Sequence, residues 1–315
     1  MIPDYKGTTV HVVSISGGKD STATLVEAIK LRAQGADVRA IFCDTGNEHP
    51  STYEYITYLS KALDIEITVL TSDFSDQLAK KRTMVAEKWD EPERSRALAV
   101  LQPTGIPFVD LCMWKGRFPG SISAFCSAEL KSSPAMDHLL SIDADRVVSW
   151  VGVRADESPR RANLPMWEAD MSTEDGGGMW VYRPIIKWRV EDVFAAHKEA
   201  GIRPNPLYQA GMTRVGCMPC MQASKRDISI IADRWPEVIN RLEEWEAVVS
   251  AASKRGSSTF FSTSSDSTVS RSEEVDYTTH GIRRIVEWAQ TARGGRQTQL
   301  LFEAPACSSV YGLCE

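Results

Sequence analysis

Ser16-Gly17-Gly18-Lys19-Asp20-Ser21 joins an apolar run that ends at Ile15 to a helical pattern that begins at Thr22. Two adjacent glycines let the backbone turn tightly and bring successive N–H groups to one point. The N-terminus of the following helix adds partial positive charge. Together with the lysine ammonium and two serine hydroxyls, this arrangement predicts a cradle for an anion such as phosphate. The alternative is an ordinary glycine turn between a strand and a helix.

Strand and helix patterns alternate on both sides of this loop. Residues 9–15, 38–43 and 66–70 have the composition of buried strands, whereas residues 22–34 and 51–63 have the spacing of amphipathic helices. This alternation predicts an α/β fold, a doubly wound parallel sheet with helices on both faces, followed by a helical C-terminal region. Ligands of such sheets bind at the carboxyl ends of the strands, which is where the glycine loop falls.

The middle of the chain is predicted to be mainly helical. Residues 74–122 have the pattern of a largely helical insertion, and a helix over 127–140 is expected before a strand over 146–153. Residues 165–180 are acidic and glycine-rich, which predicts a mobile surface loop. Helices are expected again from about 190 to 249, apart from a turn between 204 and 220.

Three regions are predicted along the chain. Residues 1–249 form the α/β domain, including the cysteines discussed below. Residues 250–280 are rich in serine and threonine and poor in aliphatics, which predicts a flexible linker. Residues 281–315 are expected to form a short helix and a cysteine-containing tail.

The composition restricts the class of protein. The 315 residues are 43% hydrophobic and 25% charged, as in an ordinary soluble enzyme. No apolar run approaches a membrane span, and the first residues do not resemble a secretory signal, so the expected localisation is the cytoplasm. A net charge of −6 argues against a uniformly basic nucleic-acid binder but is compatible with a local basic groove.

Seven cysteines in such a chain favour metal or redox chemistry over a disulfide framework. Cys217 and Cys220 form a C-x-x-C pair that can reach one metal, and Cys126 comes just before a predicted helix. Thiolate sets of this kind hold zinc or an iron–sulfur cluster. Buried cysteines without a ligand are the remaining alternative.

Asp44-Thr45-Gly46 ends a predicted strand beside the glycine loop. The backbone there could hydrogen-bond an adenine edge, and Asp44 could hold a magnesium ion or orient the nucleotide. An Asx-type turn with a glycine is equally compatible with the pattern.

The glycine loop resembles the signature of the PP-loop ATP pyrophosphatases, which cleave ATP between its α- and β-phosphates. Other segments resemble the PAPS reductase family, a branch of that superfamily, and the motif content is similar to phosphorothioation-type sulfur-transfer enzymes. The resemblance covers roughly residues 9–235, and its motifs occur in the family's order. The matching segments are Phe42 to Glu54, Gly152 to Arg161, Arg183 to Val193, Pro204 to Tyr208 and Gly216 to Cys220.

The loop chemistry and the resemblance together imply a set of site residues. Arg154 and Arg161 are suited to bidentate contacts with phosphate or sulfate, although a solvated loop pairing with Asp156 and Glu157 is the alternative. The catalytic candidates are Lys19, Asp20, Asp44 and Arg154. The candidates for nucleotide binding are Ser14, Ser16, Gly17, Gly18, Lys19, Asp20, Ser21, Asp44, Thr45, Gly46, Arg154 and Arg161.

The resemblance also bears on the thiols. In the APS reductases a cluster is held by a Cys-Cys pair ahead of a helix together with the later C-x-x-C, and here Phe125 stands in place of the first cysteine. Either the cluster has an open iron, or Cys112, Cys307 or Cys314 completes it. Cys112 is preferred because it lies close upstream of Cys126. The predicted ligands are Cys112, Cys126, Cys217 and Cys220, with a 4Fe-4S cluster favoured over zinc.

The favoured function is an ATP pyrophosphatase that uses ATP and Mg²⁺ to adenylate a substrate and an iron–sulfur cluster to support sulfur transfer, as in nucleic-acid phosphorothioation or thiolation. A sulfonucleotide reductase is the alternative, but those reductases generally carry a degenerate loop without the lysine, so Lys19 favours ATP. A non-catalytic nucleotide-binding subunit with structural zinc is the third hypothesis. The implied partners are an adenine nucleotide, a nucleic-acid substrate, and a cysteine desulfurase or other complex subunits, without a membrane.

Overall fold

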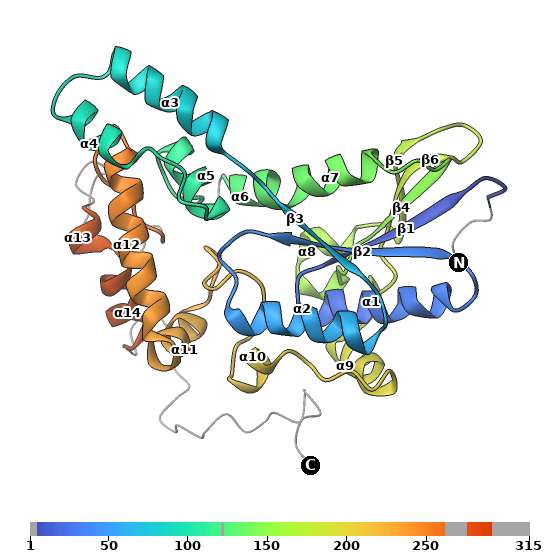
Figure 1. The fold of residues 1–315 in the computed structure, drawn as a ribbon. Helices are drawn as coiled ribbons and strands as arrows, with labels where there is room; N and C mark the ends of the chain where they lie inside the picture. The colour runs from blue at the N-terminus through green and yellow to red at the C-terminus, as the bar shows by residue number, and fades with distance from the viewer. Residues whose placement is uncertain (1–4, 121–122, 262–275, 292–315) are drawn as a thin grey trace.

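The computed structural model describes residues 5–120, 123–261 and 276–291, and a six-stranded sheet occupies one half of the molecule (Figure 1). The strand order is β3-β2-β1-β4-β6-β5, and all neighbours are parallel except β5 and β6. The predicted α/β fold with a parallel-dominated sheet is therefore confirmed. The strands are β1 (Thr9–Ile15), β2 (Asp37–Asp44), β3 (Ile67–Thr71), β4 (Arg146–Trp150), β5 (Trp167–Ser172) and β6 (Gly178–Tyr182).

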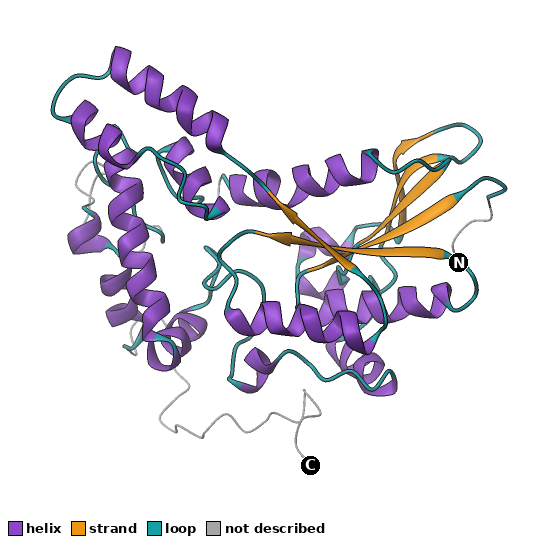
Figure 2. Cartoon of the chain, viewed as in Figure 1, coloured by secondary structure: helices purple, strands orange, loops and turns teal. Residues whose placement is uncertain are grey.

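Helices cover both faces of the sheet and form a second group beside the end of β3 (Figures 1 and 2). The described helices are α1 (Lys19–Arg32), α2 (Pro50–Ala62), α3 (Ser75–Lys88), α4 (Glu93–Val100), α5 (Pro107–Lys115), α6 (Phe125–Ser127), α7 (Ser133–Leu140), α8 (Pro159–Ala162), α9 (Val190–Glu199), α10 (Pro206–Gln209), α11 (Lys225–Arg234), α12 (Pro236–Ala252), α13 (Tyr277–His280) and α14 (Ile282–Ala289). Two short turns complete them, the π-helical η1 (Ala128–Ser132) and the 3₁₀ η2 (Ala155–Glu157). None of the helices in these ranges is long and apolar enough to cross a bilayer.

The central strand β1 is apolar on both sides because both of its faces are covered. Successive side chains of a strand point to opposite faces, and the neighbours Val12 and Val13 are both fully buried. Val13 packs in a cluster with Leu25 of α1 and Leu59 of α2. Val12 packs in a separate cluster with Leu139 of α7. This two-sided burial explains why the strand has a nearly continuous hydrophobic run rather than an alternating one.

The hairpin of β5 and β6 corrects the prediction of a mobile surface loop over residues 165–180. The two strands pair antiparallel at the edge of the sheet, with an irregular register between Ala169 and Met171. The ring of Trp167 stacks on Trp180 and also contacts Tyr182, both at 5.3 Å between ring centroids. Most of β5 is exposed, so acidic residues are tolerated there and reduce pairing with another chain. That edge position gives the segment its loop-like composition.

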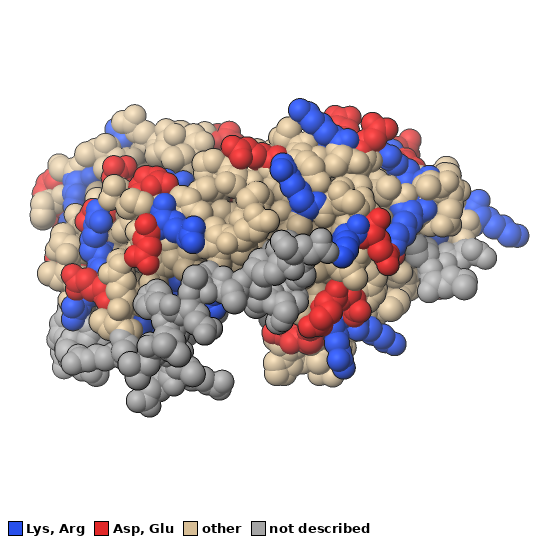
Figure 3. Space-filling model, turned by 90° about the horizontal axis from the view of Figure 1, so that it is seen from below, with Lys and Arg blue, Asp and Glu red and all other residues tan. Residues whose placement is uncertain are grey.

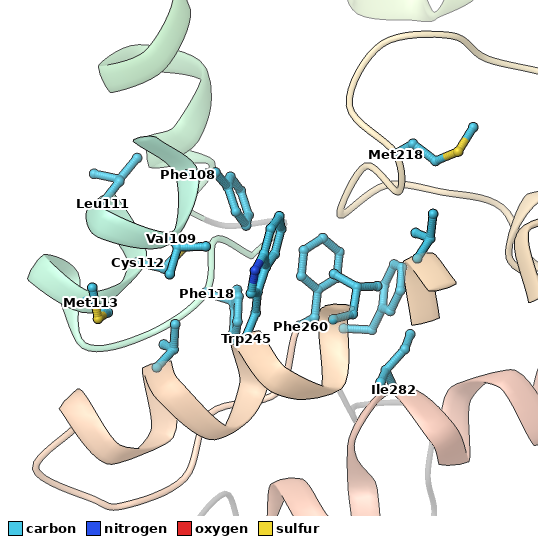
Figure 4. Close-up of a cluster of buried hydrophobic side chains, with 14 of the residues drawn as sticks. Phe108, Val109, Leu111, Cys112, Met113, Phe118, Met218, Trp245, Phe260 and Ile282 are labelled. Carbon is cyan, nitrogen blue, oxygen red and sulfur yellow. The ribbon is translucent and has the colours of Figure 1, made fainter. Parts of the chain in front are cut away.

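The second group of helices has its own hydrophobic core, which confirms the predicted helical character of residues 74–122. Aromatic rings from three segments form its centre (Figure 4). Phe108 of α5 lies 5.7 Å from Trp245 of α12 and 5.8 Å from Phe260, and Phe118 lies 5.4 Å from Phe260. Since α5 and α12 are far apart in sequence, this core depends on tertiary packing of the chain's C-terminal part against the insertion.

Part of the predicted linker belongs to this core. Residues 250–252 complete α12, Phe260 is 2% exposed, and Phe261 is also buried. After the gap in the described residues the chain resumes in α13. Residues 262–275 lie outside the described residues, as do residues 292–315 with Cys307 and Cys314.

Glu246 of α12 binds the backbone of two segments, one at Phe260 and the other at the start of α14. Its carboxylate is 1% exposed and accepts backbone hydrogen bonds from Phe260 (2.7 Å) and Ile282 (2.8 Å). A Cβ on Gly281 would lie 2.3 Å from the Oε2 atom of this glutamate, so only glycine allows the close approach. Burial raises the pKa of Glu246 to about 7.

We expect this carboxyl group to make stability depend on pH. Its folded pKa lies above the ordinary value of 4.5, so the protonated form favours folding, and this contribution is lost as pH rises from about 4.5 to about 7. The free energy of unfolding should fall across that range by on the order of 3 kcal/mol relative to Glu246→Gln. Denaturant titrations of both proteins at several pH values measure the difference. Parallel pH profiles would contradict it.

Candidate functional site

The glycine loop lies at the carboxyl end of β1, as predicted. Gly17 has a φ of +73°, in the left-handed region, and a Cβ there would lie 2.9 Å from the Thr52 side chain. Helix α1 begins at Lys19, directly after Gly18, which as the N-cap residue makes no side-chain hydrogen bond. The partial positive charge of the helix N-terminus therefore follows the loop directly, as it does in anion sites.

Three side chains from a distant part of the chain hold the loop. His197 of α9 donates from Nε2 to the carbonyl of Lys19 at 2.8 Å, and Asn205 donates from Nδ2 to the carbonyl of Gly17 at 3.1 Å. The Tyr208 hydroxyl accepts from the backbone N–H of Lys19 at 2.9 Å. Burial lowers the pKa of His197, so the ring is neutral with its proton on Nε2. Asn205 and Tyr208 belong to a motif quoted from the sequence, whereas His197 had no sequence signal.

A chain of charges joins the loop to the end of β4. The Lys19 ammonium lies 3.2 Å from one oxygen of Asp20, and the Arg154 Nε lies 2.5 Å from the other. Arg154 is 5% exposed and also pairs with Asp156 at 2.6 Å. Gly152 makes this approach possible, since a Cβ there would lie 2.9 Å from the backbone of Asp20. Three of the four predicted catalytic residues are thus in one cluster.

Arg161 takes part in a different contact. It lies in α8, its side chain is 39% exposed, and its guanidinium pairs with Glu157 four residues earlier. The Arg161–Glu157 and Arg154–Asp156 pairs are those expected from the alternative in which this segment is a solvated charged loop. The pairing of Arg154 with Asp20 was not foreseen, because their 134-residue separation in sequence hides it.

The turn after β2 is built by two carboxylates. Asp44 accepts hydrogen bonds from the Gly46 N–H at 2.9 Å and from the Tyr53 hydroxyl at 2.7 Å, which makes it the first residue of an Asx turn. Glu48 is 4% exposed and accepts from the backbone and the hydroxyl of Thr45. Burial raises the pKa of Glu48. Glu48 is not among the predicted site residues, since a glutamate in a turn is expected to be solvated.

The thiols of the C-x-x-C turn lie next to this glutamate. Cys217 contacts an oxygen of Glu48 at 3.5 Å, and burial raises its pKa to about 11 despite the opposing charge of Lys131. Cys126 and Cys217 each interact electrostatically with Cys220, so the thiols of α6 and the turn face one region. Within the described ranges, however, no three His, Cys, Asp or Glu side chains are arranged to hold a metal ion.

Cys112, the preferred fourth ligand, lies in a different environment. It is fully buried in α5, between Leu111 and Met113 of the aromatic core (Figure 4). Burial raises the pKa of its thiol well above the ordinary value, and a charge on Cys126 would raise it further. A thiol in such apolar surroundings behaves as a small hydrophobic group unless a metal displaces its proton.

Asn47 and Arg241 fix the C-x-x-C turn to the rest of the site. The carbonyl of Asn47 accepts from the N–H of Met218 at 2.7 Å, and its side-chain amide donates to the carbonyl of Pro219 at 3.0 Å. Arg241 of α12 donates to the carbonyl of Met218 at 2.9 Å. The thiol turn is therefore anchored both to the loop after β2 and to the second group of helices.

The comparisons with known proteins agree with this architecture. The phosphoadenosine phosphosulfate reductase domain model matches residues 10–223, a range that includes the glycine loop and the C-x-x-C turn. A 37.8 kDa protein from the gpa 5′ region of Escherichia phage 186 is 46% identical over 334 residues, which cover 99% of this chain and 98% of that protein.

Two enzymes match over shorter stretches. An adenosine 5′-phosphosulfate reductase of Neisseria meningitidis is 33% identical over 126 residues, 38% of this chain and 48% of the reductase. A phosphoadenosine 5′-phosphosulfate reductase of Vibrio vulnificus is 26% identical over 207 residues, 65% of this chain and 64% of the reductase. The chain thus spans less than two thirds of the length of either reductase.

Asn205→Ala is expected to destabilise the site and the fold. The residue is 1% exposed, caps α10 by accepting from the Leu207 N–H, and satisfies the Gly17 carbonyl. Losing the cap costs about 1 kcal/mol, and a buried carbonyl without a donor costs about 1–3 kcal/mol more. Urea unfolding measures the loss, with the exposed Asn163→Ala as the control. Equal midpoints for the two variants would show that the contact contributes nothing.

Proposed function

Since the chain belongs to the phosphoadenosine phosphosulfate reductase domain family, we propose that it is an ATP pyrophosphatase that adenylates a substrate and supports sulfur transfer. One observation carries this proposal. The Lys19 ammonium lies at the N-terminus of α1, beside the Asp20 carboxylate that the buried Arg154 holds, and at the carboxyl end of the sheet. This is a place for a polyphosphate, and a positive charge there has its largest effect on a phosphate leaving group.

In the proposed reaction the substrate oxygen attacks the α-phosphorus of ATP. The bond from that phosphorus to the oxygen bridging to the β-phosphate breaks, and pyrophosphate leaves with the bonding electrons. The amides of the glycine loop and Lys19 stabilise the charge that develops on pyrophosphate, a catalysis by positioning and electrostatics. Asp44, at the end of β2, is the residue proposed to hold the magnesium ion that accompanies ATP.

Asp20 and Arg154 act as positioning residues in this scheme. The Arg154 guanidinium binds one oxygen of Asp20, and Lys19 lies at the other. Because Arg154 is almost fully buried, the carboxylate cannot rotate freely, and the ammonium is held near the first turn of α1. Arg161 stays a candidate for contacts with the nucleotide, and would have to exchange Glu157 for a phosphate to make them.

Sulfur transfer is the second half of the proposal. The terminal sulfur of a persulfide supplied by a cysteine desulfurase attacks the activated centre, and AMP leaves with the electrons of the bond to its oxygen. The substrate is then joined to the carrier through an S–S bond, and attack of a second thiol on the carrier sulfur releases the thiolated substrate and leaves a disulfide. A nucleic acid is the proposed substrate class. Cys126, Cys217 and Cys220 would hold an iron–sulfur cluster or zinc, with Cys112 as the preferred fourth ligand. Their donor chemistry fits such a group, but their geometry does not, because the Cys217 thiol faces Glu48. We therefore assign no step to a cluster.

A sulfonucleotide reductase is the second candidate, favoured by the two reductases that match the chain. Such an enzyme binds a nucleotide without β- and γ-phosphates, so Lys19 would have no leaving group to stabilise. The ATP pyrophosphatase hypothesis expects the site to bind ATP, and the reductase hypothesis expects it to bind adenosine 5′-phosphosulfate. Tight binding of the sulfonucleotide with no measurable affinity for ATP would favour the reductase.

Lys19→Ala is expected to reduce pyrophosphate release from ATP about 100-fold or more, since it removes the charge at the leaving group. The thermal unfolding midpoint should change little, because the ammonium pairs with the partly exposed Asp20 and its contact with the Tyr208 ring is long, at 5.7 Å. Lys30→Ala, in the last turn of the same helix, is the matched control and should keep full activity. Equal pyrophosphate release by Lys19→Ala and the wild type would contradict the proposed role of the loop.

Protein purified without oxygen is expected to be brown and to contain iron and sulfide if the thiols hold a cluster. Cys217→Ala should bleach the colour, whereas Cys43→Ala, at the end of β2, should not. Iron, sulfide and zinc analysis of all three proteins gives the answer. A colourless wild-type protein that contains zinc would restrict the site to a structural metal, and a metal-free protein would remove the cluster from the proposal.

A further inference from the structure

A groove of about 840 Å³ lies on the second group of helices, between α3, α5 and the segment after α12. Six of its thirteen lining residues are basic, and no aspartate or glutamate of the described chain is among them. In a protein with a net charge of −6, such a concentration of one sign is unexpected. The basic residues are Lys80, Lys81, Lys115, Arg117, Lys254 and Arg255.

Lys81 is a buried ammonium group in this groove, and its burial costs free energy of folding. Its side chain is 9% exposed, and its ammonium donates to the carbonyl of Met113 at 2.6 Å. Burial lowers its pKa to about 8. Among the described residues, no ion pair neutralises Lys80, Lys81, Arg117 or Lys254, whereas Lys115 pairs with Glu129. An anionic ligand would supply the missing countercharge.

Two tryptophans make the groove aromatic as well as basic. Trp89 and Trp114 are partly buried and line it together with the cations. The Trp114 ring stacks on Phe74 with 5.8 Å between centroids, and the Lys115 ammonium lies 3.7 Å from its ring centre. Aromatic rings beside a positively charged groove are how proteins bind single-stranded nucleic acid, because bases stack on the rings while cations hold the phosphates.

The surroundings of the groove favour this occupant over an anionic membrane. The large exposed hydrophobic side chains of the described residues, Val69, Leu140 and Met171, do not line it. A surface that inserts into lipid needs such side chains. On the face in Figure 3, basic and acidic side chains are interspersed outside the grey atoms.

One end of the groove lies near helix α6. The Arg117 guanidinium lies 5.3 Å from the centre of the Phe125 ring and donates to the Ser123 hydroxyl. Phe125 opens α6, whose next residue is Cys126. A strand held by Arg117 would therefore lie close to α6, which carries Cys126.

We propose that this groove binds single-stranded nucleic acid. Identifying the bound strand as the acceptor of sulfur rests on the proposed function, but binding itself does not depend on ATP cleavage. Trp89 offers its ring to a base, and Lys80, Arg117 and Lys254 take the phosphates. The groove makes no demand on base sequence, since stacking and charge are both insensitive to it.

Fluorescence anisotropy with labelled single-stranded DNA and RNA of about 20 nucleotides tests the proposal on the full chain. Changing Lys80, Arg117 and Lys254 together to Gln should weaken binding at least about 10-fold at low salt. Because the salt dependence of single-strand binding scales as about 0.7 per phosphate contact, the slope of log K against log salt should fall by roughly 2. The matched control carries Lys30→Gln, Lys61→Gln and Lys198→Gln on α1, α2 and α9, and should bind like the wild type.

Trp89→Ala separates stacking from charge. It should weaken binding about 5-fold or more with an unchanged salt slope, because an aromatic contact releases no counterions. Equal losses in the groove triple variant and its control would overturn the proposal. So would the absence of oligonucleotide binding, or tighter binding of polyglutamate or of phosphatidylserine vesicles than of the oligonucleotide.

The same proteins distinguish this inference from the proposed function. The groove triple variant should keep the ATP affinity of the wild type, and Lys19→Ala should keep the oligonucleotide affinity. Oligonucleotide binding without pyrophosphate release would support the nucleic-acid groove and contradict the proposed ATP chemistry. Pyrophosphate release without oligonucleotide binding would support the ATP chemistry and contradict the groove.

Discussion

The site depends on satisfying the carbonyls of the glycine loop from a distant part of the chain. A loop that turns its amides toward a ligand leaves its carbonyls facing the protein, where each needs a donor. His197 and Asn205 supply those donors from α9 and from the start of α10. The region after the sheet is thus needed to complete the first loop of the molecule, and an isolated strand–loop–helix would lack this support.

The same principle explains the polar groups between the two halves of the molecule. Glu48 and Asn47 are buried and Arg241 is half-buried where the turn after β2 meets the C-x-x-C turn and α12. Groups of this kind cost free energy unless hydrogen bonds satisfy them, and here most of them are satisfied by backbone atoms. They contribute a defined position for the thiol turn more than net stability.

The limits of sequence analysis can be seen at particular elements. Edge strand β5 has a loop-like composition because most of it faces solvent, so burial periodicity was weak there. Phe260 and Phe261 lie in a serine- and threonine-rich stretch, and their burial depends on α5 and α12, which no local pattern reports. Arg154 was predicted to contact phosphate or sulfate, whereas in the structure it also pairs with Asp20, 134 residues away.

What the sequence determined by itself is local. The spacing of apolar residues and the paired glycines are enough to predict β1, the loop and α1, because the backbone conformation and amphipathicity of a short segment depend on its own residues. The parallel sheet followed from repetition of that pattern. Only the tertiary structure decided which charges and thiols lie together, which carboxyl groups are buried, and where basic residues line a groove. Those properties depend on solvent exclusion and on contacts between segments far apart in the chain, and neither is encoded in the spacing of neighbouring residues.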